Sequence, residues 1–331
     1  MTRAYLAFTD TGLALARWLA DALPGSVDRC GSGVSLAGWT ALQFAQSDAL
    51  VFVGAVGIAV RAIAPHCRSK ASDPAVVVLD ECGRFAVPVL SGHLGGANDL
   101  ARALAAVCGA VPVITTATDA HGIFAVDEWA KHQNCTVLEA ERIKHVSSKL
   151  LAGQSVRFAA EFPVQGTLPA GVDPARTPAE ADFALTLSPA GDALHLVPRI
   201  GVLGLGCRRG TCAEQLEAAF ADFCARHSLA PACIAAAASI DLKADEAGLL
   251  AFCRTHGWPI TFYSAEQLRA LPGPFTPSPF VQSVTGVDNV CERAAVLASG
   301  GCIRIPKQAG GGVTFALALC PYAPDWRWQN G

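Results

Sequence analysis

Short apolar runs alternate with Ala- and Leu-rich stretches along most of this chain, and this alternation limits the fold more than any other feature. In the first third, AYLAFT, ALVFVG and AVVVLD have the composition of buried strands, whereas TGLALARWLADAL and GANDLARALAAVCG have the spacing of amphipathic helices. Strands that alternate with helices predict a mostly parallel sheet covered by helices. The turn ECGR between AVVVLD and FAVPVL predicts one hairpin within that sheet.

A second region of the same kind begins at RIGVLGLGCRRGT, where Thr211 and Glu214 predict a capping box that starts a helix at Thr211. Between the two regions, FPVQGTLPAGVDPARTP is rich in Pro and Gly, which is typical of a loop. We therefore expect an α/β fold with two three-layer α/β units and mostly parallel sheets. They occupy residues 1–135 and 199–331, and a small, less regular middle segment with short strands joins them at residues 136–198.

Composition excludes several classes of protein. Of 331 residues, 52% are hydrophobic and 16% are charged, which is enough apolar material for a folded core. A net charge of −3 argues against a nucleic-acid partner. The longest apolar run, ALVFVGAVGIAV, is too short to span a membrane, and the 13 cysteines have no disulfide or zinc spacing. We expect a soluble cytoplasmic protein with no protein-bound metal.

Four segments that follow strands are rich in Gly or polar residues: VGAVGIAVRAIAP, SGHLGGAND, TTATDAHG and GLGCRRGT. In parallel α/β sheets, ligands bind beyond the carboxyl ends of strands, where helix N-termini attract carboxylates and phosphates. The dinucleotide pattern G-x-G-x-x-G fails because GLGCRRG has one residue too many, and the P-loop pattern does not occur. A nucleotide-dependent enzyme is therefore disfavoured, although it stays an alternative.

The segment SGHLGGAND carries the first candidate site. His93 is suited to general acid or base catalysis, and Ser91 and Asn98 beside it are polar. Gly95 and Gly96 would allow a ligand to approach the backbone closely. The alternative is a turn in which the histidine bonds to the backbone.

The other three segments supply further candidates. Arg61 could clamp a carboxylate or could simply be a charge on a helix surface. Thr115, Thr116 and Asp119 could bind or polarise a substrate, or residues of that segment could only cap the next helix. Arg208 and Arg209 lie at a predicted helix start, an unfavourable place for cations, so an anion site is expected beside them.

Several of these segments together resemble one family. VGAVGIAVRAIAP, SDPAVVVLDECGRFAVPVLSGHLGGANDLARALA and VITTATDAHGIFAVDEWA resemble the N-terminal domain of the CbiG family of cobalamin biosynthesis, the cobalt-precorrin-5A hydrolases. VLGLGCRRGTCAEQLEAA, ASIDLKADEAGLL and SVTGVDNVCERAA resemble its C-terminal domain. The resemblance covers the first and last thirds in order and the middle only loosely. Two residues depart from the family pattern, His121 and Cys212.

This resemblance implies ring chemistry on a cobalt-containing tetrapyrrole of vitamin B12 synthesis. Water opens a δ-lactone that joins the ring A acetate to the methylated meso carbon C20. The two-carbon unit then leaves as acetaldehyde, which gives cobalt-precorrin-5B. The cobalt is carried within the macrocycle, so the protein needs no cofactor of its own. Transient contact with other enzymes of the corrin pathway is also expected.

The candidate residues can be given roles in this chemistry. As the base that activates water we expect His93. The oxyanion donors are expected to be the Asn98 amide or the backbone N–H groups of Gly95 and Gly96, and Asp119 or His93 is expected to remove the proton during carbon–carbon cleavage. The residues expected to bind substrate are Arg61, Ser91, Gly95, Gly96, Thr115, Thr116, Arg208, Arg209 and Thr211. A non-catalytic tetrapyrrole-binding partner of the pathway's methyltransferases is the alternative function.

Overall fold

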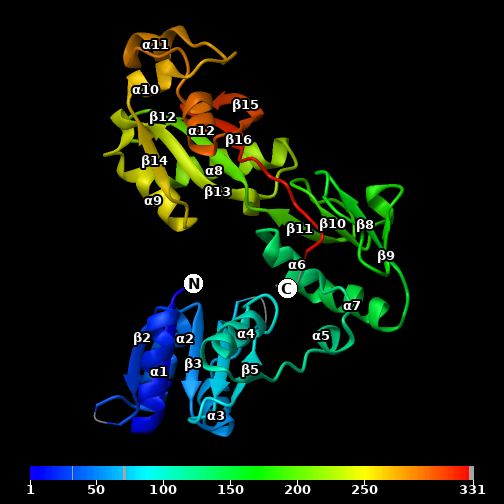
Figure 1. Ribbon diagram of the computed structural model, residues 1–331. Coiled ribbons are helices and arrows are strands. Elements are labelled where there is room, and N and C mark those ends of the chain that lie inside the picture. The colour runs from blue at the N-terminus through cyan, green and yellow to red at the C-terminus, as the bar shows by residue number, and fades with distance from the viewer. Residues whose placement is uncertain (32, 70–71, 328–331) are drawn as a thin grey trace.

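The first part of the chain forms a six-stranded sheet with the strand order β2-β1-β3-β4-β5-β6. The computed structural model describes residues 1–31, 33–69 and 72–327 (Figure 1). The strands are β1 (Arg3–Ala7), β2 (Ser26–Arg29), β3 (Ala49–Val53), β4 (Ala75–Leu79), β5 (Phe85–Leu90) and β6 (Val111–Pro112). β4 and β5 pair antiparallel and the other pairs are parallel, which confirms the predicted hairpin.

Helices cover both faces of this first sheet. α1 (Asp10–Ala22) and α4 (Ala97–Cys108) pack on one face, and α2 (Leu36–Gln46) and α3 (Val56–Ile63) pack on the other. The N-cap side chains of Thr9 and Ser35 accept hydrogen bonds from the first turns of α1 and α2. The three-layer arrangement expected for this unit is therefore confirmed.

The reversal of β5 decides where the candidate segments lie. Leu90 at the end of β5 pairs with Val76 at the start of β4. Residues that follow β5 therefore emerge at the sheet edge where β1, β3 and β4 begin, opposite the edge where α3 begins. The sequence placed VGAVGIAVRAIAP, which follows β3, and SGHLGGAND, which follows β5, beyond the carboxyl ends of parallel strands. That common placement is wrong, because the carboxyl end of an antiparallel strand lies at the other edge.

The middle part of the chain forms a five-stranded sheet of its own, with the order β7-β11-β10-β8-β9. Its strands are β7 (Cys135–Val137), β8 (Val156–Ala160), β9 (Val172–Pro174), β10 (Phe183–Leu185) and β11 (Leu194–Pro198). The preceding and intervening helices are α5 (Ala117–His121), α6 (Val126–His132) and α7 (Ile143–Leu151), with 3-10 turns at Ala140–Arg142 and Pro178–Glu180. β9 lies within the stretch predicted as loop, so the middle part is more regular than the sequence indicated.

The core of this middle part draws on residues from outside it. Trp129 of α6 is fully buried there with Phe124, Phe158 and Phe183. These residues lie on both sides of position 135, the boundary expected from the sequence. The domain boundaries stay predictions, but α6 packs with the middle sheet.

The last part forms a third sheet with the order β14-β13-β12-β16-β15. Its strands are β12 (Gly201–Cys207), β13 (Ile234–Ile240), β14 (Ile260–Tyr263), β15 (Cys302–Gly310) and β16 (Val313–Leu319). β12, β13 and β14 are parallel, whereas β15 and β16 form an antiparallel hairpin on β12. The whole chain is thus a mixed α/β fold, as predicted.

Helices also cover both faces of the third sheet. α8 (Ala213–Arg226) and α9 (Ala247–Thr255) pack on one face. α10 (Ala265–Ala270), α11 (Pro279–Thr285) and α12 (Cys291–Ser299) pack on the other, and 3-10 turns lie at Pro231–Cys233 and Asp241–Lys243. The predicted helix start at Thr211 is wrong by one residue, because the N-cap is Cys212. Thr211 Oγ1 instead donates to the Arg208 carbonyl at 2.8 Å.

None of the helices in the described ranges has both the length and the apolar character needed to cross a membrane.

After β16 the chain returns to the middle sheet. Trp326 stacks on Trp129 with ring centroids 4.8 Å apart and planes 14° apart, and it meets the edge of Phe158 at 4.7 Å. The Trp129 indole donates to the Asp325 carbonyl at 2.6 Å. In Figure 1 this red segment runs from β16 towards α6. The final residues therefore complete the core of the middle part.

We expect Trp326→Ala to destabilise the middle part by about 3–5 kcal/mol, because it removes a large buried aromatic side chain. Chemical unfolding followed by near-ultraviolet circular dichroism measures the loss. The control is Trp18→Ala, since Trp18 is 52% exposed. Equal effects of the two substitutions would contradict the assigned packing.

Candidate functional site

His93 lies between two carboxylates. Its Nδ1 is 3.0 Å from Asp127 Oδ1, and its Nε2 is 2.8 Å from Asp119 Oδ2. The histidine follows β5, Asp119 lies on α5 and Asp127 lies on α6. The three side chains are 8–11% exposed. This site therefore forms where the edge of the first sheet meets the two helices that follow it.

Side chains of α4 surround the same carboxylates. The Asn98 amide donates to Thr116 Oγ1 at 3.1 Å and to Asp119 Oδ2 at 3.2 Å. Thr116 Oγ1 also donates to Asp119 Oδ2. Arg102 donates to Asp119 Oδ1 at 2.5 Å. His93, Asn98, Thr116 and Asp119, singled out from the sequence, are therefore brought together; we call these residues with Asp99, Arg102, Asp127, Glu128 and Lys131 the His93 cluster.

Electrostatics favour the protonated form of His93. Burial lowers the pKa of this imidazole, but the hydrogen bond and charge of Asp127, followed by the hydrogen bond of Asp119, raise it to about 9. Burial also raises the pKa of Asp119, yet bonds from Thr116, His93 and Arg102 outweigh it and lower that pKa below its ordinary value. A pKa near 9 favours the protonated ring at neutral pH, and both nitrogens contact carboxylates. The base role expected for His93 stays a prediction, and the protonated ring is also suited to donate a proton.

Glu128 is the other titratable group that the site perturbs. Its side chain is 2% exposed, Oε1 accepts from Arg102 at 3.4 Å, and Oε2 is buried without a hydrogen-bond partner in the described ranges. Burial raises the pKa of Glu128 to about 7, against the opposing charge of His93. Glu128 therefore exchanges a proton near neutral pH.

The cluster also has the donor atoms of a possible metal site. One nitrogen of His93 and one oxygen each of Asp119 and Glu128 lie within 4.8 Å of one another. Arg102, however, already bonds to both of these carboxylates. Because the guanidinium supplies positive charge at the same oxygens, the residues present do not favour a cation there. That the protein binds no metal stays a prediction.

The glycines of SGHLGGAND serve local packing. Gly96 has φ +86° and is the N-cap of α4, and a Cβ on it would collide with Lys131 Nζ. A Cβ on Gly95 would collide with Ser91 Cβ. Ser91 itself has φ 54° and donates to the Asp73 carbonyl at 2.9 Å. These contacts explain why both positions need glycine, and the close approach of a ligand to Gly95 and Gly96 stays a prediction.

Two predicted substrate-binding residues lie away from the His93 cluster. Arg61 is exposed in the last turn of α3, on the face of the first sheet opposite α4. Its role as a carboxylate clamp stays a prediction, and so does the alternative of a charge on a helix surface. Thr115 is an exposed residue that precedes the N-cap of α5.

A second candidate site lies in the third sheet's unit. A cavity of about 610 Å³ opens at the carboxyl ends of β12 and β13 and is covered by α11; we call it the β12 pocket. Its apolar wall includes Leu242, Phe280, Val281 and Val284. Two parallel strands end there side by side, so the cavity lies where α/β sheets commonly bind ligands.

Four cationic side chains line the β12 pocket: Arg208, Arg209, Lys243 and Lys307. Lys243 Nζ bonds to Glu246 Oε1 at 2.9 Å, and Arg209 Nε lies 3.7 Å from the same oxygen. Within the described ranges, Arg208 and Lys307 have no such carboxylate partner. The anion site that the sequence predicted beside Arg208 and Arg209 stays a prediction, and the surplus positive charge of this pocket is where it would lie. Thr211 is not among the residues that line this cavity in the described ranges, and its hydroxyl donates to the Arg208 carbonyl.

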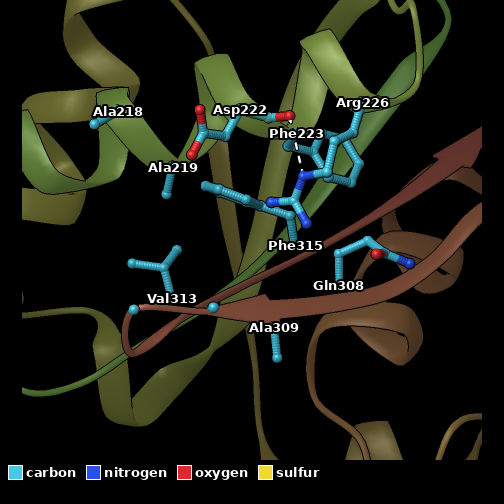
Figure 2. Close-up of a pocket in the computed structure, with 11 residues that line it drawn as sticks. Ala218, Ala219, Asp222, Phe223, Arg226, Gln308, Ala309, Val313 and Phe315 are labelled. Carbon is cyan, nitrogen blue, oxygen red and sulfur yellow. Dashed lines mark hydrogen bonds between the residues drawn. The ribbon is translucent and has the colours of Figure 1, made fainter.

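A smaller cavity of about 280 Å³ lies between α8 and the β15–β16 hairpin (Figure 2). Figure 2 shows Arg226 of α8 and Phe315 of β16 on its two sides, with Arg226 Nε donating to the Asp222 carbonyl at 3.3 Å. It has less than half the volume of the β12 pocket. A bulky ligand therefore fits the β12 pocket better.

Sequence reasoning missed important members of both sites. Asp127 and Glu128 form a carboxylate pair inside the apolar run FAVDEWA, and that unusual context was an available signal. Arg102 lies three residues after Asp99 on one helix face, which was a weaker signal. Lys307 reaches the β12 pocket from β15, and no local pattern indicated this.

Comparisons with known proteins agree for both end regions. The family model described as "Cobalamin synthesis G N-terminal" matches residues 38–119, and the one described as "Cobalamin synthesis G C-terminus" matches residues 201–318. The first range includes His93 and Asp119, and the second includes the described walls of the β12 pocket. The middle part lies outside both models.

Individual relatives extend over most of the chain. A cobalt-precorrin-5A hydrolase of Priestia megaterium is 32% identical over 304 residues, which cover 84% of this chain and 80% of that protein. The cobalt-precorrin-5A hydrolase of Salmonella typhimurium is 36% identical over 293 residues, 83% of each. Protein CobE of a Sinorhizobium species is 35% identical over 120 residues, which cover 35% of this chain and 78% of CobE.

The raised pKa of His93 predicts a pH-dependent contribution to stability. The contribution is complete below about pH 6.5, the ordinary histidine pKa, and is lost as the pH rises towards 9. We expect His93→Gln to cost on the order of 3 kcal/mol more near pH 6 than near pH 9.5. Chemical unfolding of both proteins across this range measures the difference.

His121→Gln is the control for that experiment, since His121 is an exposed histidine at the end of the neighbouring helix α5. A stability difference for His93→Gln that does not change with pH would contradict the protonated ring.

Proposed function

Because this chain belongs to the CbiG family of cobalt-precorrin-5A hydrolases and takes part in cobalamin biosynthesis, we propose that it carries out the reaction of that name. In this reaction water opens the δ-lactone of cobalt-precorrin-5A. The two-carbon unit then leaves as acetaldehyde, and the product is cobalt-precorrin-5B. The cobalt enters and leaves within the macrocycle, so the proposal needs no metal bound by the protein.

The observation that carries this proposal is the composition of the β12 pocket. A corrin precursor combines a flat apolar ring with several carboxylates on its rim. The pocket combines an apolar wall with Arg208, Arg209, Lys243 and Lys307. Guanidinium and ammonium groups bind carboxylates strongly, and apolar side chains favour the ring. We propose that this pocket holds the macrocycle by its rim carboxylates.

The proton transfers are assigned to the His93 cluster. When water attacks the lactone carbonyl, the acyl C–O bond breaks and the leaving oxygen takes a proton from the His93 imidazolium. One proton of the attacking water stays on the new carboxyl group, and the Asp119 carboxylate accepts the other. The now neutral His93 ring then takes the hydroxyl proton as the C–C bond breaks; the macrocycle keeps the electron pair of that bond and acetaldehyde departs. The Asn98 amide is the candidate donor to the developing oxyanion.

This assignment requires movement between the units. Figure 1 shows α11 and α4 at widely separated ends of the chain's fold, with the middle sheet between their units. A macrocycle bound in the β12 pocket reaches His93 only if the first and third units approach each other. Motions of this kind are common for domains joined by modest interfaces.

A non-catalytic tetrapyrrole-binding protein is the second candidate. One observation favours it: CobE corresponds to about a third of this chain, so one part of the fold exists as a separate protein. A protein that only binds the tetrapyrrole would not need the β12 pocket and the His93 cluster to lie close together. Such a protein would hand its ligand to another enzyme of the pathway through a transient contact.

We expect the purified protein to release one acetaldehyde per cobalt-precorrin-5A consumed under anaerobic conditions. His93→Ala lowers the turnover number by about 100-fold or more, the usual scale for a general acid or base. Acetaldehyde is measured with a coupled dehydrogenase. Binding of the substrate without acetaldehyde release would favour the second candidate.

Arg208→Ala separates binding from chemistry. Arg208 has no carboxylate partner within the described ranges, so its removal costs little stability but weakens the hold on a substrate carboxylate. We expect KM to rise about tenfold while kcat changes little. Arg254→Ala, on α9 outside the pocket, is the control. A loss in kcat with unchanged KM would contradict a binding role for Arg208.

A further inference from the structure

Helix α11 forms one wall of the β12 pocket and leaves large apolar side chains exposed. Phe280 is 76% exposed and Val284 is 62% exposed, although both line the cavity. Val281, between them, packs against the core beneath the helix. Phe280 and Val284 together with Leu242 thus form a continuous apolar lining at this cavity, and an apolar lining with a few charged groups is typical of a ligand site.

Two adjacent residues of α12 hold the ends of the segment that carries α11. Glu292 accepts from the Thr276 backbone at 2.7 Å and from the Asn289 amide at 2.8 Å. Arg293 pairs with Asp288 at 2.9 Å and lies 4.5 Å from the Phe275 ring centroid. The segment is thus fixed at residues 275–276 and 288–289, while α11 projects between these points.

The same Glu292 also joins this segment to the opposite wall of the pocket. Its Oε1 accepts from the Lys307 backbone at 2.6 Å, and Lys307 lines the cavity from β15. The carboxylate therefore sets the spacing between α11 on one side and a cation on the other. Glu292 therefore fixes the distance between the two walls at the bottom of the pocket.

From this arrangement we infer that Phe280 is a specificity residue that stacks on the face of a planar tetrapyrrole while the pocket's cations hold its carboxylates. The inference rests on the proposed function, which supplies the tetrapyrrole as ligand. It adds that Phe280 of α11 contacts the face of the ring. Stacking on an aromatic side chain selects for a flat ring, whereas the cations alone would accept any polycarboxylate.

Charge favours this ligand over an apolar peptide. Arg208 and Lys307 bring positive charge to the pocket without carboxylate partners in the part of the chain that the structure describes. A purely apolar partner would bury these charges unpaired, which is unfavourable. An anionic ring satisfies the cations and covers Phe280 and Val284 at the same time.

The first test measures protection of α11 in the full-length protein. Chymotrypsin cleaves after exposed phenylalanines, and Phe280 is exposed in the free protein. The probe is uroporphyrin, a planar tetrapyrrole with carboxylates around its rim. We expect uroporphyrin to slow cleavage after Phe280 by about tenfold or more, with cleavage sites read by mass spectrometry.

Phe85 is the internal control for this test, because it is 47% exposed on β5, in another unit. Equal protection at Phe85 and Phe280, or protection at neither with the ring bound, would overturn the inference.

The second test compares variants of Phe280. We expect Phe280→Ala to weaken uroporphyrin binding by about tenfold, and Phe280→Tyr to keep wild-type affinity because it keeps a stacking ring. Phe85→Ala is the matched control for the loss of an exposed phenylalanine. A linear polycarboxylate such as polyglutamate should bind all of these proteins equally. Wild-type affinity of Phe280→Ala for uroporphyrin would overturn the inference.

These tests separate the inference from the proposed reaction. Uroporphyrin has no lactone, so its binding reports on ring recognition alone, and acetaldehyde release from cobalt-precorrin-5A reports on the reaction. Ring-dependent binding through Phe280 without acetaldehyde would support the inference and contradict the hydrolase. Acetaldehyde release together with unchanged uroporphyrin binding by Phe280→Ala would support the hydrolase and contradict the inference.

Discussion

The balance of charge inside the His93 cluster is the constraint on which the arrangement of the first half of the chain depends. Four carboxylates, Asp99, Asp119, Asp127 and Glu128, come together with three cationic groups, His93, Arg102 and Lys131. Loss of one partner leaves a buried charge unpaired, which typically costs about 3–5 kcal/mol. Since the acids lie on α4, α5 and α6, the cluster also joins the first sheet to the helices that lead into the middle part. Any chemical role of His93 is therefore combined with a structural one.

Much of the fold could be predicted because its signals are local. Alternation of strands and helices and the ECGR hairpin each depend on neighbouring residues, and both occur in the structure. The consequence of the hairpin was harder to predict, since reversal of one strand moves everything after it to the opposite sheet edge. The strand at Val172–Pro174 was missed because Pro- and Gly-rich sequence gives no strand signal.

The candidate sites could be predicted only in part. His93, Asn98 and Asp119 could be grouped because their segments follow strands that are neighbours in one sheet. Their partner Arg102 faces inward from a helix whose sequence resembles an ordinary charged surface, whereas Glu128 was marked only by its apolar neighbours in FAVDEWA. For the β12 pocket, Arg208 and Arg209 were recognisable from an electrostatically poor position at a helix start. Phe280 and Lys307 reach the pocket through tertiary packing alone, and no short-range pattern encodes that packing.

The return of the last residues to the middle sheet has a consequence for synthesis of the chain. Trp326 lies far along the chain from β11, and the entire third unit is made between them. At ordinary translation rates, on the order of ten seconds passes between the appearance of these two elements. During that time the aromatic surface around Trp129 has no cover from its own chain. The first and third units can close their cores as they leave the ribosome, whereas the middle part must wait until Trp326 has been made and is the place where a chaperone has most to protect.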